Sequence, residues 1–231
     1  MKLAAMMDPA ELDVICAFLR PEHVMFEFGS GGSTGEWARR VKKVYAAEHI
    51  AVWADRVREA LAAENITNAQ VVSRPPDMDA FERLFSGCTK RGITEPGELP
   101  DWCSPNFDAK WREAPTDHRV QVFKDYVGAI GSVGESRFDV VLVDSRCRGE
   151  CALAALPYVS VNSYVIIHDW NLEEEGPVEG GGYLKLPPRK ALPSYERVLE
   201  FYDVVAEVSP KTHPDRCSRC GLVVLRKKLA N

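Results

Sequence analysis

Short apolar runs alternate with amphipathic segments along most of this chain. Runs rich in β-branched and aromatic residues, bounded by turn residues, predict buried strands. These strands are expected at 23–28, 44–48, 69–73, 138–143 and 164–167. Apolar residues at helical spacing predict the helices between them. The helical segments are expected at 34–40, 52–63, 123–130 and 151–156. Alternating strands and helices are typical of an α/β fold with a mainly parallel sheet.

A further helix is expected before the first strand. Asp8 has the character of an N-cap, Pro9 suits the first helical position, and Glu11 stands three residues after the cap. Pro21 ends the segment.

Two stretches interrupt the alternation. Residues 74–116 hold six prolines and only short helical fragments, which indicates an insertion rather than an ordinary connection. Residues 172–193 are polar and rich in glycine and proline, which indicates a mobile loop. The chain then predicts a short helix near 195–201 and strands at 202–208 and 222–226. We expect a single domain over 1–231.

Composition narrows the function classes. The formal net charge is −5, so the chain has no overall basic field for nucleic acid. Apolar residues make up 45% and charged residues 27%, which is ordinary globular usage. No apolar run approaches the ~20 residues that cross a bilayer, and the N-terminal apolar stretch is too short for a secretory signal. Seven cysteines, an odd number, favour reduced thiols. We therefore expect a cytoplasmic protein.

The first strand leads directly into a glycine-rich turn. In open α/β sheets this turn lies where a nucleotide-like ligand approaches the backbone most closely. The residues expected to contact such a ligand are Glu27, Gly29, Ser30, Gly31, Ser33 and Thr34. Glu48 ends the second strand, nineteen residues beyond Gly29, and is placed to accept hydrogen bonds from a ribose diol.

The details of the turn favour a methyl donor over a dinucleotide. Gly29, Gly31 and Gly35 are spaced G-x-G-x-x-x-G rather than G-x-G-x-x-G. Glu27, just ahead of the turn, is unfavourable beside a pyrophosphate and favourable beside the sulfonium and ammonium of S-adenosylmethionine. An NAD(P)-dependent oxidoreductase and a non-catalytic nucleoside-binding module of the same fold are the alternatives.

Together these features resemble the class I, Rossmann-like S-adenosylmethionine-dependent methyltransferases. The resemblance is carried by residues 27–34, Glu48, 138–144, 164–170 and 222–226. It implies a seven-stranded sheet in the order 3-2-1-4-5-7-6, with helices on both faces and an antiparallel C-terminal strand pair. It also implies that Glu27, Gly29, Gly31 and Ser33 surround the methionine end of the donor. Ser73 and Arg74 would lie near the adenine.

Polar residues end the fourth and fifth strands, where a methyltransferase aligns its acceptor. We expect Asp144, His168 and Asp169 to act there in the O-methylation of a small molecule, with His168 as general base and Asp144 also near the amine of the donor. Resemblance to the catechol and caffeoyl-CoA types implies that Asp144, Asp169 and Asn171 hold Mg²⁺. Cys147 stands where those enzymes place a lysine base, so a metal-free site is the alternative.

Two cysteine pairs allow a second metal. Cys147, Cys151, Cys217 and Cys220 would form a structural four-thiolate zinc site if their two loops meet. Free thiols are the other interpretation.

Overall fold

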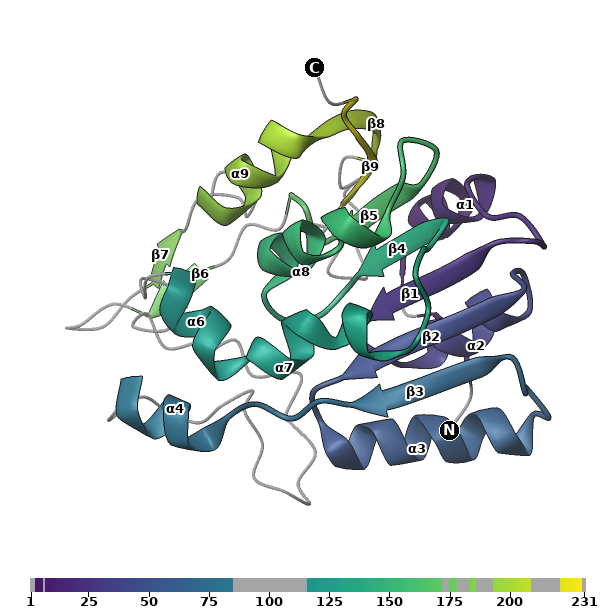
Figure 1. Ribbon diagram of the computed structural model, residues 1–231, viewed down its shortest axis with the longest axis horizontal. Helices are drawn as coiled ribbons and strands as arrows, with labels where there is room; N and C mark the ends of the chain where they lie inside the picture. The colour runs from purple at the N-terminus through teal and green to yellow at the C-terminus, as the bar shows by residue number, and fades with distance from the viewer. Residues whose placement is uncertain are drawn as a thin grey trace.

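The computed structural model describes residues 3–5, 7–84, 116–171, 175–177, 183–185, 193–208 and 221–229. A seven-stranded sheet in the order β3-β2-β1-β4-β5-β9-β8 forms its centre (Figure 1). Its strands are β1 (Val24–Phe28), β2 (Lys43–Glu48), β3 (Ala69–Ser73), β4 (Val140–Val143), β5 (Tyr164–His168), β8 (Tyr202–Val208) and β9 (Leu222–Lys227). The first five pair in parallel, whereas β9 is antiparallel to β5 and to β8. The predicted fold class and strand order are confirmed, with β8 and β9 as the expected last pair.

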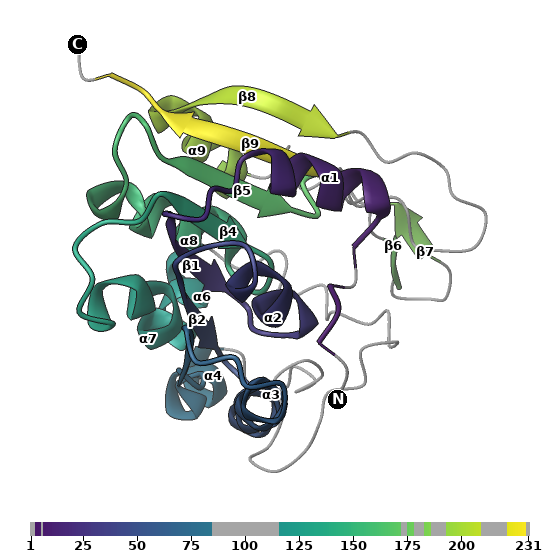
Figure 2. The same ribbon diagram turned by 90° about the vertical axis from the view of Figure 1, so that its right-hand side faces the viewer.

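Helices cover both faces of this sheet. One face carries α1 (Pro9–Ala17), α2 (Gly32–Ala38) and α3 (Ala51–Ala63). The other carries α4 (Met78–Leu84), α6 (Thr116–Val122), α7 (Lys124–Val127), α8 (Arg148–Ala154) and α9 (Pro193–Phe201). Figure 2 shows α1, α2 and α3 together on their side of the strands. Among the described residues, no helix has the length and apolar character needed to span a membrane.

Successive side chains of each strand point to opposite faces of the sheet, so an apolar core forms on each face. Val140 and Leu142 pack beneath α1 and α2, while Val141 and Val143 pack beneath α8 and α9. Because the central strands are buried on both faces, they are nearly continuous apolar runs. The same parity places Glu27 on the face of Met25, toward α2.

The N-terminal helix forms as its sequence predicts. Asp8 accepts a hydrogen bond from the Ala10 amide at 2.8 Å, and the Glu11 carboxylate accepts one from the Asp8 amide at 3.1 Å. This capping box fixes the position of Glu11. The helix ends at Ala17, before Pro21.

The predicted irregular stretches are described only in part. Residues 85–115 of the insertion lie outside the described residues, and α4 and α6 flank them. The predicted helix over 123–130 divides into α7 and a 3-10 helix at Gly128–Ser132. Within the expected loop, β6 (Glu175–Pro177) and β7 (Tyr183–Lys185) pair as a short antiparallel ribbon. The sequence did not predict these two short strands, and the rest of 172–192 lies outside the described residues.

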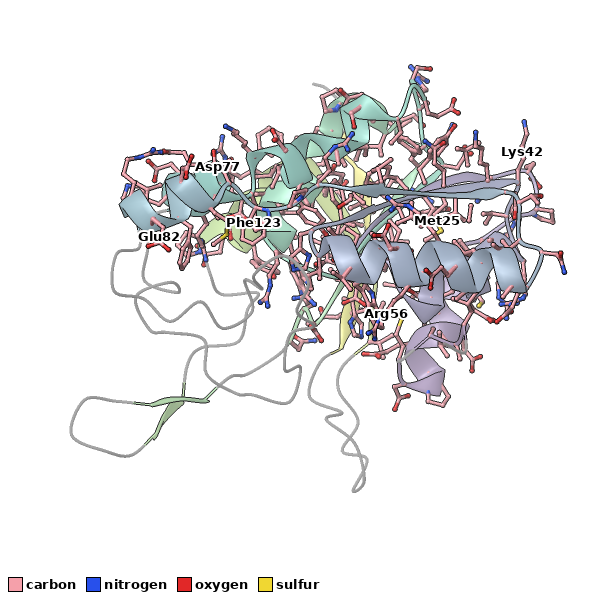
Figure 3. All side chains as sticks on the ribbon, turned by 90° about the horizontal axis from the view of Figure 1, so that it is seen from below. Met25, Lys42, Arg56, Asp77, Glu82 and Phe123 are labelled. Atoms are coloured by element: carbon pink, nitrogen blue, oxygen red, sulfur yellow. The ribbon has the colours of Figure 1, made fainter. Side chains whose placement is uncertain are left out.

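The parallel strands end on one edge, which is where the candidate site lies. In Figure 3, Lys42, which precedes β2, marks the amino edge of the sheet. Asp77, which follows β3, lies toward the opposite, carboxyl edge. Gly29, Glu48, Asp144 and Asp169 all stand at or directly after carboxyl ends of strands.

Candidate functional site

The turn after β1 requires glycine at its first position. Gly29 has φ +99°, and a Cβ there would lie 2.5 Å from the carbonyl oxygen of Asp144. The amide of Asp144 donates to the carbonyl of Phe28 at 2.9 Å. Gly29 therefore lets the β1 turn pack directly against the end of β4.

The amides of this turn are already used within the protein. Gly29 donates to the carbonyl of Ala47 at 2.8 Å, and Ser30 donates to Glu48 Oε2 at 3.0 Å. Gly31 donates to Thr34 Oγ1 at 3.0 Å. These three N–H groups consequently form no free cradle for an anion. A Cβ on Gly31 would have only Ser33 Oγ, at 3.9 Å, as a neighbour, so the space beside this glycine is open.

Glu27 of β1 links the strand to α2 through three side-chain hydrogen bonds. Its fully buried carboxylate accepts hydrogen bonds from Ser33 Oγ at 2.6 Å, Thr34 Oγ1 at 2.6 Å and Trp37 Nε1 at 3.0 Å. Burial raises the pKa of Glu27 to about 7, although the three hydrogen bonds oppose that shift. The structure thus gives Glu27, Ser33 and Thr34 a shared role in holding the turn.

Glu48 holds the same turn from the β2 side. Its Oε2 accepts from the amide and hydroxyl of Ser30, and its Oε1 accepts from the Ile50 amide at 2.9 Å. Burial would raise its pKa, but the charge and hydrogen bond of His49 and the backbone donors bring the pKa below its ordinary value. These contacts favour the ionised form of Glu48, which lies against Ser30 of the turn.

Ser73 and Arg74, for which the resemblance implies a place near the adenine, lie beside Glu48. Ser73 is the register partner of Glu48, and the Arg74 amide donates to the Glu48 carbonyl at 2.7 Å. The hydroxyl oxygen of Ser73 is buried and has no partner among the described residues. The Arg74 guanidinium instead reaches Ser132 Oγ at 2.8 Å.

The ends of β4 and β5 bring Asp144, His168 and Asp169 together. His168 Nδ1 lies 2.9 Å from Asp144 Oδ1 and 3.5 Å from Asp169 Oδ1. The sequence predicted this meeting, because neighbouring parallel strands end on the same edge. It did not indicate which other charges would be present.

A buried arginine connects the two aspartates. Arg148, the first residue of α8, places Nη2 3.0 Å from Asp144 Oδ1 and in hydrogen-bond contact with Asp169 Oδ2. Burial would raise the pKa of Asp144, but the charges and hydrogen bonds of His168 and Arg148 hold it well below its usual range. Cys147 at φ 50° and Asp169 at φ 57° adopt left-handed backbone on either side of this contact.

His168 is enclosed by carboxylates, which does not fit its expected role as general base. Its Nε2 lies 3.2 Å from Glu11 Oε2 of α1, while Nδ1 faces Asp144. Burial would lower its pKa, but Asp144, Glu11 and Asp169 raise the pKa well above its ordinary value. These carboxylates favour the protonated ring, which bridges Glu11 of α1 to Asp144 at the end of β4. We therefore assign His168 as a positioning residue, in place of the predicted role as a general base.

The expected Mg²⁺ does not fit this arrangement. The nearest ligand atoms of Asp144, His168 and Asp169 lie within 4.8 Å of one another, a separation that suits a metal. However, a guanidinium already contacts both carboxylates, and a protonated imidazole stands beside them. Asn171 Nδ2 donates to Glu207 Oε1 at 3.0 Å, on β8.

Two of the four cysteines of the predicted zinc site are among the described residues. Cys147 and Cys151 are free thiols, and burial raises the pKa of both. Cys151 Sγ donates to the carbonyl of Arg146 at 3.4 Å. Cys217 and Cys220 lie outside the described residues.

Sequence reasoning missed Glu11, Arg148 and His49 as site residues. Glu11 was predicted as part of a helix cap, and no local signal places it against His168. Arg148 follows Asp144 by four residues, a spacing at which opposite charges commonly pair, and this could have indicated the contact. His49 links Glu48 Oε1, at 3.0 Å from Nδ1, to Ser145 Oγ at 3.3 Å.

Comparisons with known proteins bear on the fold. No protein-family model matches the sequence, and no curated protein does either. A crystal structure of a methyltransferase-like protein from Silicibacter pomeroyi matches with a TM-score of 0.58 and 23% identity, covering 100% of this chain and 92% of that one. An rRNA methylase from Streptococcus thermophilus matches at 0.51 and 12%, covering 97% and 99%.

A third match carries out a different reaction. Precorrin 8W decarboxylase of Methanobacterium thermoautotrophicum matches with a TM-score of 0.51 and 12% identity, covering 98% of this chain and 92% of that one. At these identities the likeness shows the fold, which is the Rossmann-like fold of class I methyltransferases. The reaction has to be argued from the site.

Proposed function

We propose that the chain is an S-adenosylmethionine-dependent methyltransferase that O-methylates a small-molecule acceptor by in-line transfer. The acceptor oxygen attacks the methyl carbon, the carbon–sulfur bond breaks, and its electron pair returns to sulfur. The reaction needs little covalent help from the protein, so binding and alignment carry most of the catalysis.

The observation that carries this proposal is the way the β1 turn is held by acids. Glu48 accepts from Ser30 of the turn, Glu27 accepts from Ser33 and Thr34 at the start of α2, and three amides of the turn donate to acceptors within the protein. Such a turn offers its ligand the negative charge of Glu48 and few free donors. A sulfonium or ammonium is favoured in that field, and the ribose diol of the same ligand can share Glu48 with Ser30.

The same observation weighs against a nicotinamide dinucleotide. A dinucleotide-binding turn stabilises pyrophosphate through backbone N–H groups and a helix dipole. Here the amides of Gly29, Ser30 and Gly31 face other partners. The oxidoreductase alternative therefore lacks its main source of binding energy in this turn.

On the acceptor side, we assign Asp144 and Asp169 to orientation. Arg148 and His168 both contact Oδ1 of Asp144. Oδ2 can accept a hydrogen bond from the hydroxyl of an acceptor or from the amine of the donor. His168 and Arg148 keep Asp144 ionised for that task.

We propose a small acceptor rather than a nucleic acid. The net charge of −5 and the acids along the site edge oppose a polyphosphate backbone. The likeness to an rRNA methylase makes this worth testing directly. Labelled methyl incorporation should therefore be measured in a metabolite extract and, in parallel, in total RNA. Labelling of RNA alone would contradict the proposed acceptor class.

Calorimetry with a pair of glycine variants tests donor binding. We expect Gly31→Ala to bind S-adenosylhomocysteine at least ~10-fold more weakly with an unchanged melting temperature, because its Cβ points into open space beside the turn. Gly128→Ala is the matched control, since its Cβ meets nothing within 4 Å. Equal affinities of wild type and Gly31→Ala would place the donor elsewhere.

A further inference from the structure

We propose that the guanidinium of Arg148 takes the place of a divalent cation between Asp144 and Asp169, so that this site works without a bound metal ion. The orienting role of the two acids rests on the proposed function, whereas the contact of Arg148 with them does not. It assigns Arg148 as a positioning residue that the resemblance does not imply.

The geometry of one side chain supports this assignment. Nη2 of Arg148 lies 3.0 Å from Asp144 Oδ1 and also contacts Asp169 Oδ2, so a single positively charged group joins the ends of β4 and β5. Only 10% of the Arg148 side chain is exposed. A guanidinium this deeply buried needs anionic partners, and these two carboxylates are the ones it contacts.

The backbone at both ends of the contact is unusual. The turn between β4 and α8 passes through Cys147 in the left-handed region, and Arg148 begins the helix directly after it. At the end of β5, Asp169 also has a positive φ. The arginine and the second carboxylate therefore both stand where a strand gives way to a turn.

The surrounding charges would resist an additional cation. Glu11, Asp144 and Asp169 provide three carboxylates, while Arg148 and His168 provide two positive groups within the same network. One negative charge remains, and a dication would have to stand beside both positive groups. A cationic methyl donor matches that residual charge better.

Removing the arginine should expose the metal-binding capacity of the acids. Asp144 and Asp169 would then lose the guanidinium between them, and Asn171 Oδ1 is buried without a hydrogen-bond partner among the described residues. Two carboxylates and an amide oxygen are oxygen ligands that Mn²⁺ and Mg²⁺ accept. We therefore expect Arg148→Ala to gain a divalent site that the wild type lacks.

The test is a titration of the chelator-washed full chain with MnCl₂, followed by the electron paramagnetic resonance signal of free Mn²⁺. We expect Arg148→Ala to bind one Mn²⁺ per chain at least tenfold more tightly than the wild type. Arg148→Lys, which keeps the charge, should behave as wild type. Arg148→Ala combined with Asp169→Asn should lose the gain.

Arg119→Ala is the matched control. Arg119 is also a largely buried arginine, 3.6 Å from Glu150 of α8, but it does not join the two aspartates. Its loss should leave Mn²⁺ binding unchanged. Thermal unfolding shows that each variant is folded, and Arg148→Gln replaces Arg148→Ala if the latter does not fold.

Two results would overturn the proposal. One is a wild type that binds one Mn²⁺ per chain and loses it in Asp169→Asn. The other is a folded Arg148→Ala or Arg148→Gln with no gain in Mn²⁺ binding. Neither readout requires a methyl donor or acceptor, so failure here is distinguishable from failure to bind S-adenosylmethionine.

Discussion

Two pairs of acids lie along the carboxyl edge of the sheet, and they are stabilised in different ways. Glu27 relies on neutral donors, namely two hydroxyl groups and an indole, and Glu48 relies mainly on backbone amides and His49. Asp144 and Asp169 are held by the full positive charges of Arg148 and His168. In the first pair Glu48 therefore still favours a cationic ligand, whereas the second pair is largely neutralised by the protein. We refer to the first pair as the proposed donor half and to the second pair as the proposed acceptor half.

The largest expected effect comes from the donor half. Glu27→Ala would leave Ser33, Thr34 and Trp37 with buried donors and no acceptor. At about 1–3 kcal/mol for each such group, with partial rescue by water, we expect a loss of about 3–5 kcal/mol in unfolding free energy. Urea denaturation measures it. Glu36→Ala, which removes an acid paired with Arg40 on the surface of α2, should cost less than about 1 kcal/mol.

The donor half is also the part that the sequence predicted best. Strand, glycine turn, helix and the acid on the next strand follow one another within 24–48, and their contacts depend on local chain geometry. The hydrogen bonds between Glu27 and α2 could not be predicted from the sequence, because they depend on which face of β1 the Glu27 side chain occupies. The alternation of apolar runs with helices predicted a mainly parallel sheet, whereas the strand order came from the resemblance to class I methyltransferases.

Glu27 gives this half a distinctive pH dependence. Its pKa is about 7 in the folded protein and 4.5 in the reference state, so the folded state holds the proton more tightly. Wild-type stability relative to Glu27→Gln should therefore fall as pH rises from about 4.5 to about 7, by about 3 kcal/mol. Denaturation curves at pH 5 and pH 8 compare the two. A difference that stays constant would mean that Glu27 does not titrate in this range.

In the acceptor half, the main expected effect is on turnover. Asp144→Asn should reduce methyl transfer at least about 100-fold while leaving donor affinity within a few-fold, because misplacement of the acceptor affects the reaction more than donor binding. Asp139→Asn is the control, since that residue precedes β4 at the amino edge. Equal activity of the Asp144 variant and wild type on an identified acceptor would show that the acceptor site is misplaced.

For the acceptor half, the sequence indicated where the residues lie but not which charged groups contact them. Asp144, His168 and Asp169 meet because β4 and β5 are neighbours, as the strand order implied by the resemblance requires. Glu11 reaches His168 across 157 positions of sequence, and no spacing rule connects them. The charge state of His168, and with it the correction of its role, depends on that distant contact.

The smallest effect concerns His168. Its pKa in the folded protein lies well above the unfolded 6.5, so its stabilising contribution is complete below pH 6.5 and is lost only as pH rises through the higher folded pKa. His168→Gln should cost about 2 kcal/mol, with the difference from wild type constant between pH 5 and 7 and smaller at alkaline pH. A difference that vanishes between pH 6 and 7 would restore His168 as a neutral base.

The most direct test of the two halves together is a calorimetric titration of the wild-type chain with S-adenosylmethionine, S-adenosylhomocysteine and NAD, each with and without EDTA. We expect one saturable site for both adenosyl compounds, with affinities unchanged by the chelator, and no binding of NAD. Binding of NAD alone, or the absence of binding by either adenosyl compound, would contradict it.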